Sequence, residues 1–131
     1  MNQLSSDDRL AIAEVLARYC HAIDQRRWED FDELFTDDCR LDFGAVMGAF
    51  EGRDGLARFK QTIEATGVFM RHYTTNVVLH GDGARVRAES YVLAITGPAD
   101  GRMQTTGRYD DDLLKAGGRW RIRARRATIE L

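Results

Sequence analysis

His72 and Asn76 are polar residues in the middle of a stretch that is otherwise suited to a core β-strand. Residues 68–79 are predicted to form one long strand, in which the even-numbered side chains share a face. That face is apolar at both ends and polar in the middle: Val68, Met70, His72, Thr74, Asn76 and Val78. Polar groups that face a core need partners or water, so the pattern predicts a pocket wall. The alternative is that this face is exposed and that the opposite face forms the core, with Phe69, Tyr73, Val77 and Leu79.

Asp24 is the second residue that could take part in chemistry, because it ends a predicted helix that begins near Ser5. The helix macrodipole disfavours a carboxylate at that end by roughly 0.3 to 1 kcal/mol, so a compensating partner is expected. A histidine would serve, since a carboxylate orients an imidazole and stabilises its protonated form. Two histidines could pair with Asp24: His72 from the strand, or His21 three residues back on the same helix. Spacing along the helix alone favours His21.

Tyr19 and Trp28 are aromatic residues that could reach the same pocket. Tyr19 lies on the apolar stripe of the first helix and points inward, where its hydroxyl needs a partner. It could donate a hydrogen bond to a substrate oxygen, or it could be an ordinary core tyrosine. Trp28 opens a second, short helix and is expected either to pack there or to line the cavity mouth.

The composition is that of one ordinary globular domain spanning residues 1–131. The chain is 44% hydrophobic and 31% charged, with a net charge of -2, which excludes the disordered and membrane classes and gives no general attraction to nucleic acid. No signal-peptide segment or run of 18 apolar residues is present. Cys20 and Cys39 lack metal-ligand spacing and are expected to be free thiols, so a cytoplasmic location is predicted.

Five arginines crowd into residues 119–126. Four of them alternate with Trp120, Ile122 and Ala124, as on a strand with one solvated face: Arg119, Arg121, Arg123 and Arg125. This alternation argues against a nucleic-acid patch.

The order of predicted elements indicates an α+β fold. Helices are expected at 5–24, 28–35 and 52–65, with short strands at 40–43 and 49–51. Four long strands follow at 68–79, 84–95, 102–114 and 119–131, separated by glycine-rich turns. An antiparallel meander of this kind must curl around the helices to bury its apolar face. A curved sheet on helices forms a cone that can hold a blind, mostly apolar cavity.

Several segments together resemble a known family. They are Tyr19-Cys20-His21-Ala22-Ile23-Asp24, Leu34-Phe35-Thr36-Asp37-Asp38, Gly52 at a helix start, and His72-Tyr73-Thr74-Thr75-Asn76. The chain resembles the SnoaL-like branch of the nuclear transport factor two-like superfamily over nearly its whole length. It is most similar to the group of scytalone dehydratase, bile acid 7-alpha-dehydratase and hexachlorocyclohexane dehydrochlorinase. The resemblance implies a cone-shaped, cystatin-like α+β barrel with a central cavity.

The resemblance also implies roles for individual residues. In that group an aspartate at the end of the first helix orients a histidine on the sheet, and the histidine removes a proton next to the leaving group. Asp24, His72 and Tyr19 are the matching positions, and the spacing of 48 residues between the acid and the histidine agrees with the dehydrochlorinase pattern. An arginine on the last strand is also implied. Arg125 matches it by distance from Trp120, and Arg126 by strand face, so a β-bulge would decide between them.

The sequence differs from the family pattern in two places, which limits how many of the family's features can be expected in this chain. The acid that the bile acid enzyme carries after its histidine has no counterpart in Tyr91-Val92-Leu93-Ala94. Several relatives also close the cavity with a segment beyond the last strand, whereas this sequence stops at Leu131.

The expected function is a small-molecule lyase, a dehydratase or dehydrohalogenase in which His72 and Asp24 act as a general base. Tyr19 and an arginine would polarise an oxygen or the leaving group, and Trp28, Asn76 and Arg125 are expected to contact the substrate. No cofactor is expected, and no two-histidine helical motif or cysteine cluster points to a metal. The alternatives are an isomerase or polyketide-type cyclase, and a non-catalytic binding or structural subunit.

The expected partners are a small apolar substrate, aromatic or steroid-like, and further copies of the chain. No nucleic acid or membrane partner is predicted. The family implies a homodimer or homotrimer, for which the outer sheet face could supply a charged interface: Arg85, Arg87, Glu89, Asp110 to Asp112, Arg119, Arg121 and Arg123.

Overall fold

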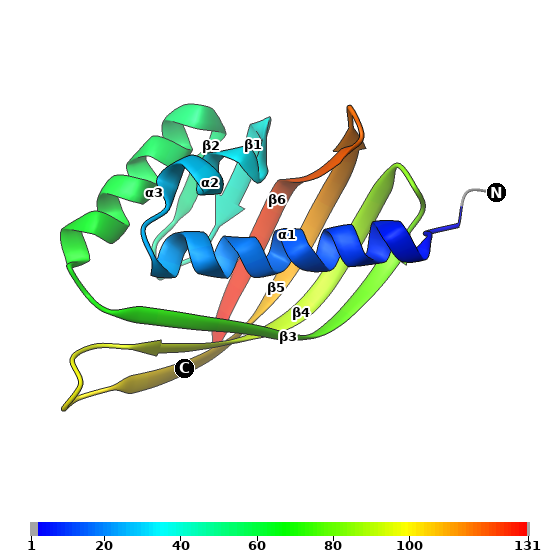
Figure 1. Ribbon diagram of the computed structural model, residues 1–131. Helices are drawn as coiled ribbons and strands as arrows, with labels where there is room; N and C mark the ends of the chain where they lie inside the picture. The colour runs from blue at the N-terminus through cyan, green and yellow to red at the C-terminus, as the bar shows by residue number, and fades with distance from the viewer. Residues whose placement is uncertain (1–2, 131) are drawn as a thin grey trace.

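The computed structural model describes residues 3–130, which form helices packed on one face of a six-stranded curved sheet (Figure 1). The helices are α1 (Ser6–Asp24), α2 (Trp28–Glu33) and α3 (Gly52–Thr66). The strands are β1 (Phe35–Asp42), β2 (Ala49–Glu51), β3 (Met70–Gly81), β4 (Arg85–Thr96), β5 (Met103–Ala116) and β6 (Arg119–Glu130). Their order in the sheet is β2-β1-β6-β5-β4-β3, and the sheet does not close. The α+β fold class predicted from the sequence is confirmed.

The sheet extends further than the predicted meander. Strands β3 to β6 pair antiparallel in chain order, as expected, and β1 then pairs parallel with β6. The prediction ended the second helix at Phe35 and started the next strand at Arg40, which is wrong on both counts. Phe35 is fully buried and already pairs with Ile122, and the register shifts between Phe35 and Arg40. The polar run Thr36-Asp37-Asp38 is this irregular strand segment rather than a helix end.

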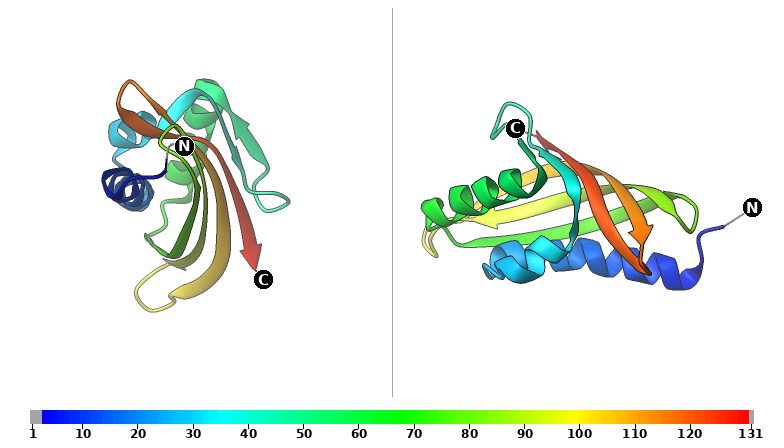
Figure 2. Two further views of the ribbon diagram at one scale, coloured as in Figure 1. Left: turned by 90° about the vertical axis from the view of Figure 1, so that its right-hand side faces the viewer. Right: turned by 90° about the horizontal axis from the view of Figure 1, so that it is seen from above.

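Helix α1 lies across the concave face of the sheet, and the strands bend around it (Figures 1 and 2). Ser5 caps its first turn by accepting a hydrogen bond from the Asp8 amide, at 3.0 Å. Its predicted apolar stripe is buried against the sheet, with Ile12, Leu16, Tyr19 and Ile23 each at most 2% exposed. None of the helices among residues 3–130 is long and apolar enough to cross a membrane.

Two β-bulges change which side chains face the core. In β3 the register shifts between Thr75 and Val78, and Asn76 adopts a left-handed backbone with φ of 57°. His72 therefore lies on the inward face before the bulge, and Leu79 packs toward the core after it. The inward face of the first half of β3 is the even-numbered one, because Tyr73 is 49% exposed.

The second bulge lies in β6. Asp112 pairs with Ala124 and Leu113 with Ile122, so Arg123 is the extra residue. The alternation of the strand reverses there, which leaves Arg125 1% exposed and Arg126 at the surface. The prediction that Arg125 shares the solvent face with Arg119, Arg121 and Arg123 is therefore wrong.

Candidate active site

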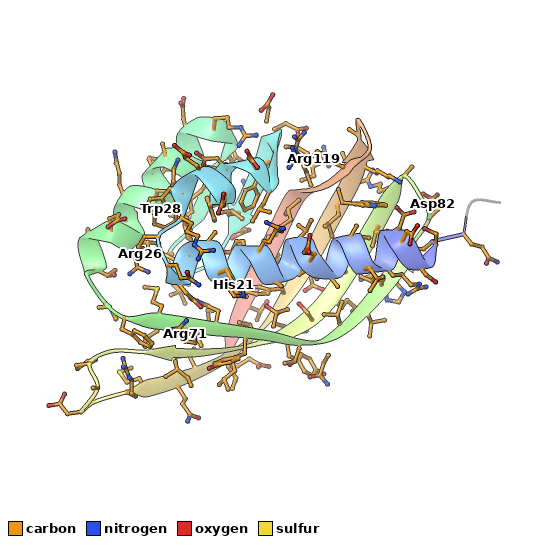
Figure 3. All side chains as sticks on the ribbon, viewed as in Figure 1. His21, Arg26, Trp28, Arg71, Asp82 and Arg119 are labelled. Atoms are coloured by element: carbon orange, nitrogen blue, oxygen red, sulfur yellow. The ribbon has the colours of Figure 1, made fainter. Side chains whose placement is uncertain are left out.

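Asp24 and His72 form a hydrogen-bonded pair between the last residue of α1 and the third residue of β3. The Asp24 Oδ1 atom lies 2.6 Å from His72 Nδ1, and Oδ2 accepts a hydrogen bond from the His72 backbone amide at 2.8 Å. The Asp24 side chain is 3% exposed and that of His72 is 16% exposed. His21, the competing candidate, lies on the exposed side of α1, and its Nδ1 is 3.2 Å from Gln25 Nε2 (Figure 3).

This pairing determines how the imidazole can act. A carboxylate only accepts hydrogen bonds, so Nδ1 is the protonated ring nitrogen of the neutral His72. The lone pair is then on Nε2, which makes no hydrogen bond to any residue from 3 to 130. His72 is thus arranged as a proton acceptor through Nε2, with Asp24 positioned to stabilise the charge that would form.

His72 borders a cavity of about 160 Å³ between the helices and the sheet. Most of its lining is apolar: Ile23, Phe43, Val46, Met47, Phe59, Ile63, Met70, Val92, Ala94, Ala127 and Ile129. The polar lining residues are Tyr19, His72, Thr96, Thr105, Thr106 and Tyr109. Asp24 does not line this cavity, but it borders a separate groove between α1 and β3, which His72 also borders. The histidine therefore stands between the carboxylate and the cavity.

Tyr19 and Tyr109 both line the cavity and pack edge to face against each other, with ring centroids 6.0 Å apart. Burial raises the pKa of the Tyr19 phenol to about 12, against the opposing positive charge of Arg125. Burial also raises the pKa of Tyr109 well above its ordinary value. Both phenols are therefore neutral hydrogen-bond donors at physiological pH.

Arg125 lies behind the two tyrosines and is paired with Asp111. Its Nε and Nη2 atoms donate to the two carboxylate oxygens of Asp111 at 2.7 and 2.8 Å, and both side chains are fully buried. The guanidinium carbon is 4.1 Å from the Tyr19 ring centroid and 3.8 Å from that of Tyr109. The Nη1 atom is buried and has no partner among residues 3–130.

Tyr109 and Asp111 belong to the site but are not among the residues predicted for it. The prediction that Asp111 lies with Asp110 and Asp112 on an exposed, charged sheet face is wrong, because Asp111 is 2% exposed. The alternation of Gly107, Tyr109, Asp111 and Leu113, all buried, is the signal that could have found both residues.

Two predicted substrate-binding residues lie away from the cavity. Trp28 packs edge-on against Phe31, and its indole nitrogen donates to Glu64 of α3 at 2.6 Å (Figure 3). Asn76 is exposed at the β3 bulge, where it borders a surface hollow with Glu89 and Arg108. Neither residue is among those that line the cavity, and Arg125, the third residue predicted to contact the substrate, is not among them either.

The two cysteines are buried free thiols, as expected from the sequence. Cys20 lies 3.2 Å from the Thr74 hydroxyl, and burial raises the pKa of its thiol. Within the part of the chain that the structure describes, no group of three His, Cys, Asp or Glu side chains is arranged to hold a metal ion.

Comparison with known proteins places the chain in a family. Residues 5–126 match the SnoaL-like domain. The chain belongs to the SnoaL-like family. A relative in Mycobacterium tuberculosis, an uncharacterised protein, is 34% identical over 121 residues, which cover 88% of this chain and 80% of the relative.

Solved structures share the fold of this SnoaL-like chain. One is a protein from Novosphingobium aromaticivorans that is provisionally identified as a scytalone dehydratase. It has a TM-score of 0.79 and 25% identity, over 95% of this chain and 85% of that protein. Another is a hexachlorocyclohexane dehydrochlorinase, with a TM-score of 0.84 and 17% identity over 95% of this chain and 86% of the other. The second likeness shows the fold alone.

Proposed function

We propose that this SnoaL-like protein is a cofactor-independent lyase that eliminates water or halide from a small molecule, with His72 as the general base. The observation that carries the proposal is the Asp24–His72 pair, in which one imidazole nitrogen is held by a buried carboxylate while the ring borders an apolar cavity. The imidazole therefore lies between the carboxylate that orients it and the cavity that would hold the substrate, which is the arrangement that general-base catalysis needs.

The reaction follows from this order of groups. His72 Nε2 takes a proton from the carbon next to the one that bears the leaving group. The C–H electron pair becomes the new carbon–carbon double bond, and the leaving group departs with its own bonding pair. Asp24 stabilises the imidazolium that forms, and a departing hydroxide can recover the proton from it as water. Tyr19, a neutral phenol on the cavity wall, is placed to donate a hydrogen bond to an oxygen or halide.

One comparison supports the same class of reaction. The similar structure from Novosphingobium aromaticivorans is provisionally identified as a dehydratase, and dehydration is an elimination. The apolar lining suits a small apolar or aromatic substrate. A steroid-like substrate fits less well, because an engineered cavity of about 150 Å³ in another protein accommodates benzene.

The second candidate function is that of an isomerase or cyclase. His72 would again act as the base, but no group would leave the substrate. The buried Tyr19 and Tyr109 favour it, because two donors beside Arg125 could hold an oxygen while a proton moves. Non-catalytic binding is the third reading, in which the cavity holds a ligand that His72 does not transform.

The test is a panel of β-hydroxy ketones and halogenated cycloalkanes, assayed by enone absorbance, by halide release, and by NMR for products that keep the substrate's formula. The lyase proposal expects an elimination product, and turnover that falls about 10²- to 10⁴-fold in His72→Ala. An isomerised product would favour the second class. Binding without any product, or unchanged turnover in His72→Ala, would contradict the proposed base.

A further inference from the structure

We infer that Arg26 is a positioning residue for the base. Its guanidinium fastens the chain that leads into β3 to the end of α1, and this contact helps to set the distance between the Asp24 carboxylate and the His72 ring. The inference rests on the proposed function for its effect on turnover. Its effect on the contact between Asp24 and His72 can be measured without any substrate.

Arg26 occupies a backbone position that usually belongs to glycine. Its φ is 55°, in the left-handed region, directly after the end of α1. The Arg26 amide donates to the Ile23 carbonyl at 3.2 Å. The next amide, that of Arg27, donates to the Ala22 carbonyl at 2.8 Å. These two bonds form a Schellman ending, in which glycine is the common residue at the left-handed position. The backbone therefore gives no reason for an arginine here, and the reason must be sought in its side chain.

The half-buried Arg26 side chain joins two segments that are far apart in the sequence. Its Nη1 atom donates to the Ile23 carbonyl at 2.8 Å, as basic side chains often do at a helix end. Its Nη2 atom donates to the Val68 carbonyl at 2.7 Å, across 42 residues. Figure 3 shows Arg26 at the end of α1, beside the chain that leads from α3 into β3. A helix cap needs only the first of these bonds, so the second has a separate role.

Val68 lies in the link of residues 67–69, which is neither helix nor strand. The amide of Val68 donates to the Thr66 hydroxyl at 3.2 Å, while its carbonyl accepts from Arg26. Both polar groups of this residue are therefore held, and β3 begins two residues later, at Met70. Arg26 thus fixes the point from which β3 starts.

The end of α1 holds β3 at two backbone points. β3 is an edge strand, because the sheet order ends with it, so one side of its backbone faces no other strand. On that side the His72 amide donates to Asp24 and the Val68 carbonyl accepts from Arg26. In extended chain, residues an even number apart direct their backbone groups to the same side. The end of α1 therefore takes the place of a strand neighbour along this stretch.

Two anchors restrain the strand more than one does. With the Asp24 contact alone, the start of β3 could pivot about His72, and the 2.6 Å contact between Oδ1 and Nδ1 would open. The second anchor, four residues earlier, opposes that movement. Arg26 is not among the residues that line the cavity, so it acts on the orientation of His72 and not on the substrate. A misplacement of a catalytic group by about 1 Å can lower a rate by roughly a hundredfold.

Arg26→Gly tests the inference, because glycine suits the left-handed backbone and only the side chain is lost. We expect kcat on a substrate from the panel to fall about ten- to hundredfold, with little change in KM. Hydrogen exchange at the His72 amide, followed by NMR, should become at least about tenfold faster, because that amide reports local opening between β3 and α1. Arg26→Asn, which also accepts the left-handed backbone, should behave in the same way. Arg27→Gln, at the neighbouring exposed arginine, is the matched control and should change neither quantity.

A residue that only capped α1 would give a different result. Its loss would lower the stability of the fold, while exchange at the His72 amide and kcat per folded molecule would stay at the wild-type values. Wild-type exchange at that amide in Arg26→Gly, or a wild-type kcat in this variant, would overturn the inference. Faster exchange in Arg26→Gly, in a protein whose wild type converts no compound of the panel, would refute the lyase and leave the positioning role standing.

Discussion

Both carboxylate oxygens of Asp24 accept hydrogen bonds from one residue, His72. One oxygen accepts from the ring Nδ1 and the other from the backbone amide. The amide contact holds the strand against the end of α1, and the ring contact selects the tautomer. Each oxygen therefore has a separate function, one in placing the backbone and one in orienting the base. A substitution that spares one contact and alters the other can separate the two.

Asp24→Asn is that substitution. One amide oxygen can still accept from the His72 backbone, while the NH2 group faces Nδ1 and favours the tautomer protonated on Nε2. We expect kcat to fall by about 10²- to 10⁴-fold, with a much smaller loss of stability. Steady-state kinetics on a substrate from the panel measures this, with His21→Gln as the exposed control. Equal kcat values for Asp24→Asn and the wild type would show that the carboxylate does not orient the base.

The Arg125–Asp111 pair should behave as one unit in unfolding experiments. Replacing either partner alone leaves an uncompensated buried charge, so Arg125→Met and Asp111→Leu should each cost about 3 to 5 kcal/mol of unfolding free energy. The double variant should lose much less than the sum. Urea unfolding measures the cycle, and Arg126→Met at the exposed neighbour should change stability by under about 0.5 kcal/mol. Additive losses would argue against a direct pair.

Alkaline pH should destabilise the fold through the buried phenols. The pKa of Tyr19 is raised from 10.0 to about 12, so between these values the folded chain binds more protons than the unfolded chain. Stability is thus fully present below pH 10 and is lost as pH rises toward 12, by roughly 2 to 3 kcal/mol for this group. Urea unfolding from pH 8 to 11.5 should show a shallower decline for Tyr19→Phe. Parallel curves for the two proteins would contradict this assignment.

The β3 bulge depends on the left-handed backbone at Asn76. Asn76→Gly should keep or slightly raise stability, because glycine adopts φ of 57° without a Cβ penalty. Asn76→Val should cost about 1 to 2 kcal/mol, since a β-branched residue disfavours that conformation. Thermal unfolding of the pair provides the comparison. A valine variant as stable as the glycine variant would mean that the bulge does not constrain the strand.

Periodicity predicted most of the fold, because long helices and strands repeat their apolar residues over many turns. The inward face of α1 follows from apolar spacings of three and four residues, and the even-numbered face of β4 follows from alternation. Pairing between distant segments does not have such a signature. The parallel pairing of β1 with β6 brings Phe35 beside Ile122, and nothing local in either segment specifies it.

The candidate site was predicted in part, for two physical reasons. The strand pattern offered His72 as a partner of Asp24, but helix spacing favoured His21. The family resemblance was needed to favour His72, which is 48 residues away from Asp24 in the sequence. Bulges at Asn76 and Arg123 then reversed the alternation within strands. The second bulge turned Arg125 inward beside Asp111, so the charged pair behind Tyr19 and Tyr109 could not be found by counting residues along β6.

The protonation of the His72 ring tests the central claim most directly and needs no substrate. Long-range ¹H–¹⁵N NMR at alkaline pH distinguishes protonated from unprotonated ring nitrogens in the wild type and in Asp24→Asn. The dyad predicts a proton on Nδ1 and a free Nε2 in the wild type, with the reverse in Asp24→Asn. A wild-type ring protonated on Nε2, or a tautomer that the substitution leaves unchanged, would contradict His72 as the base of this site.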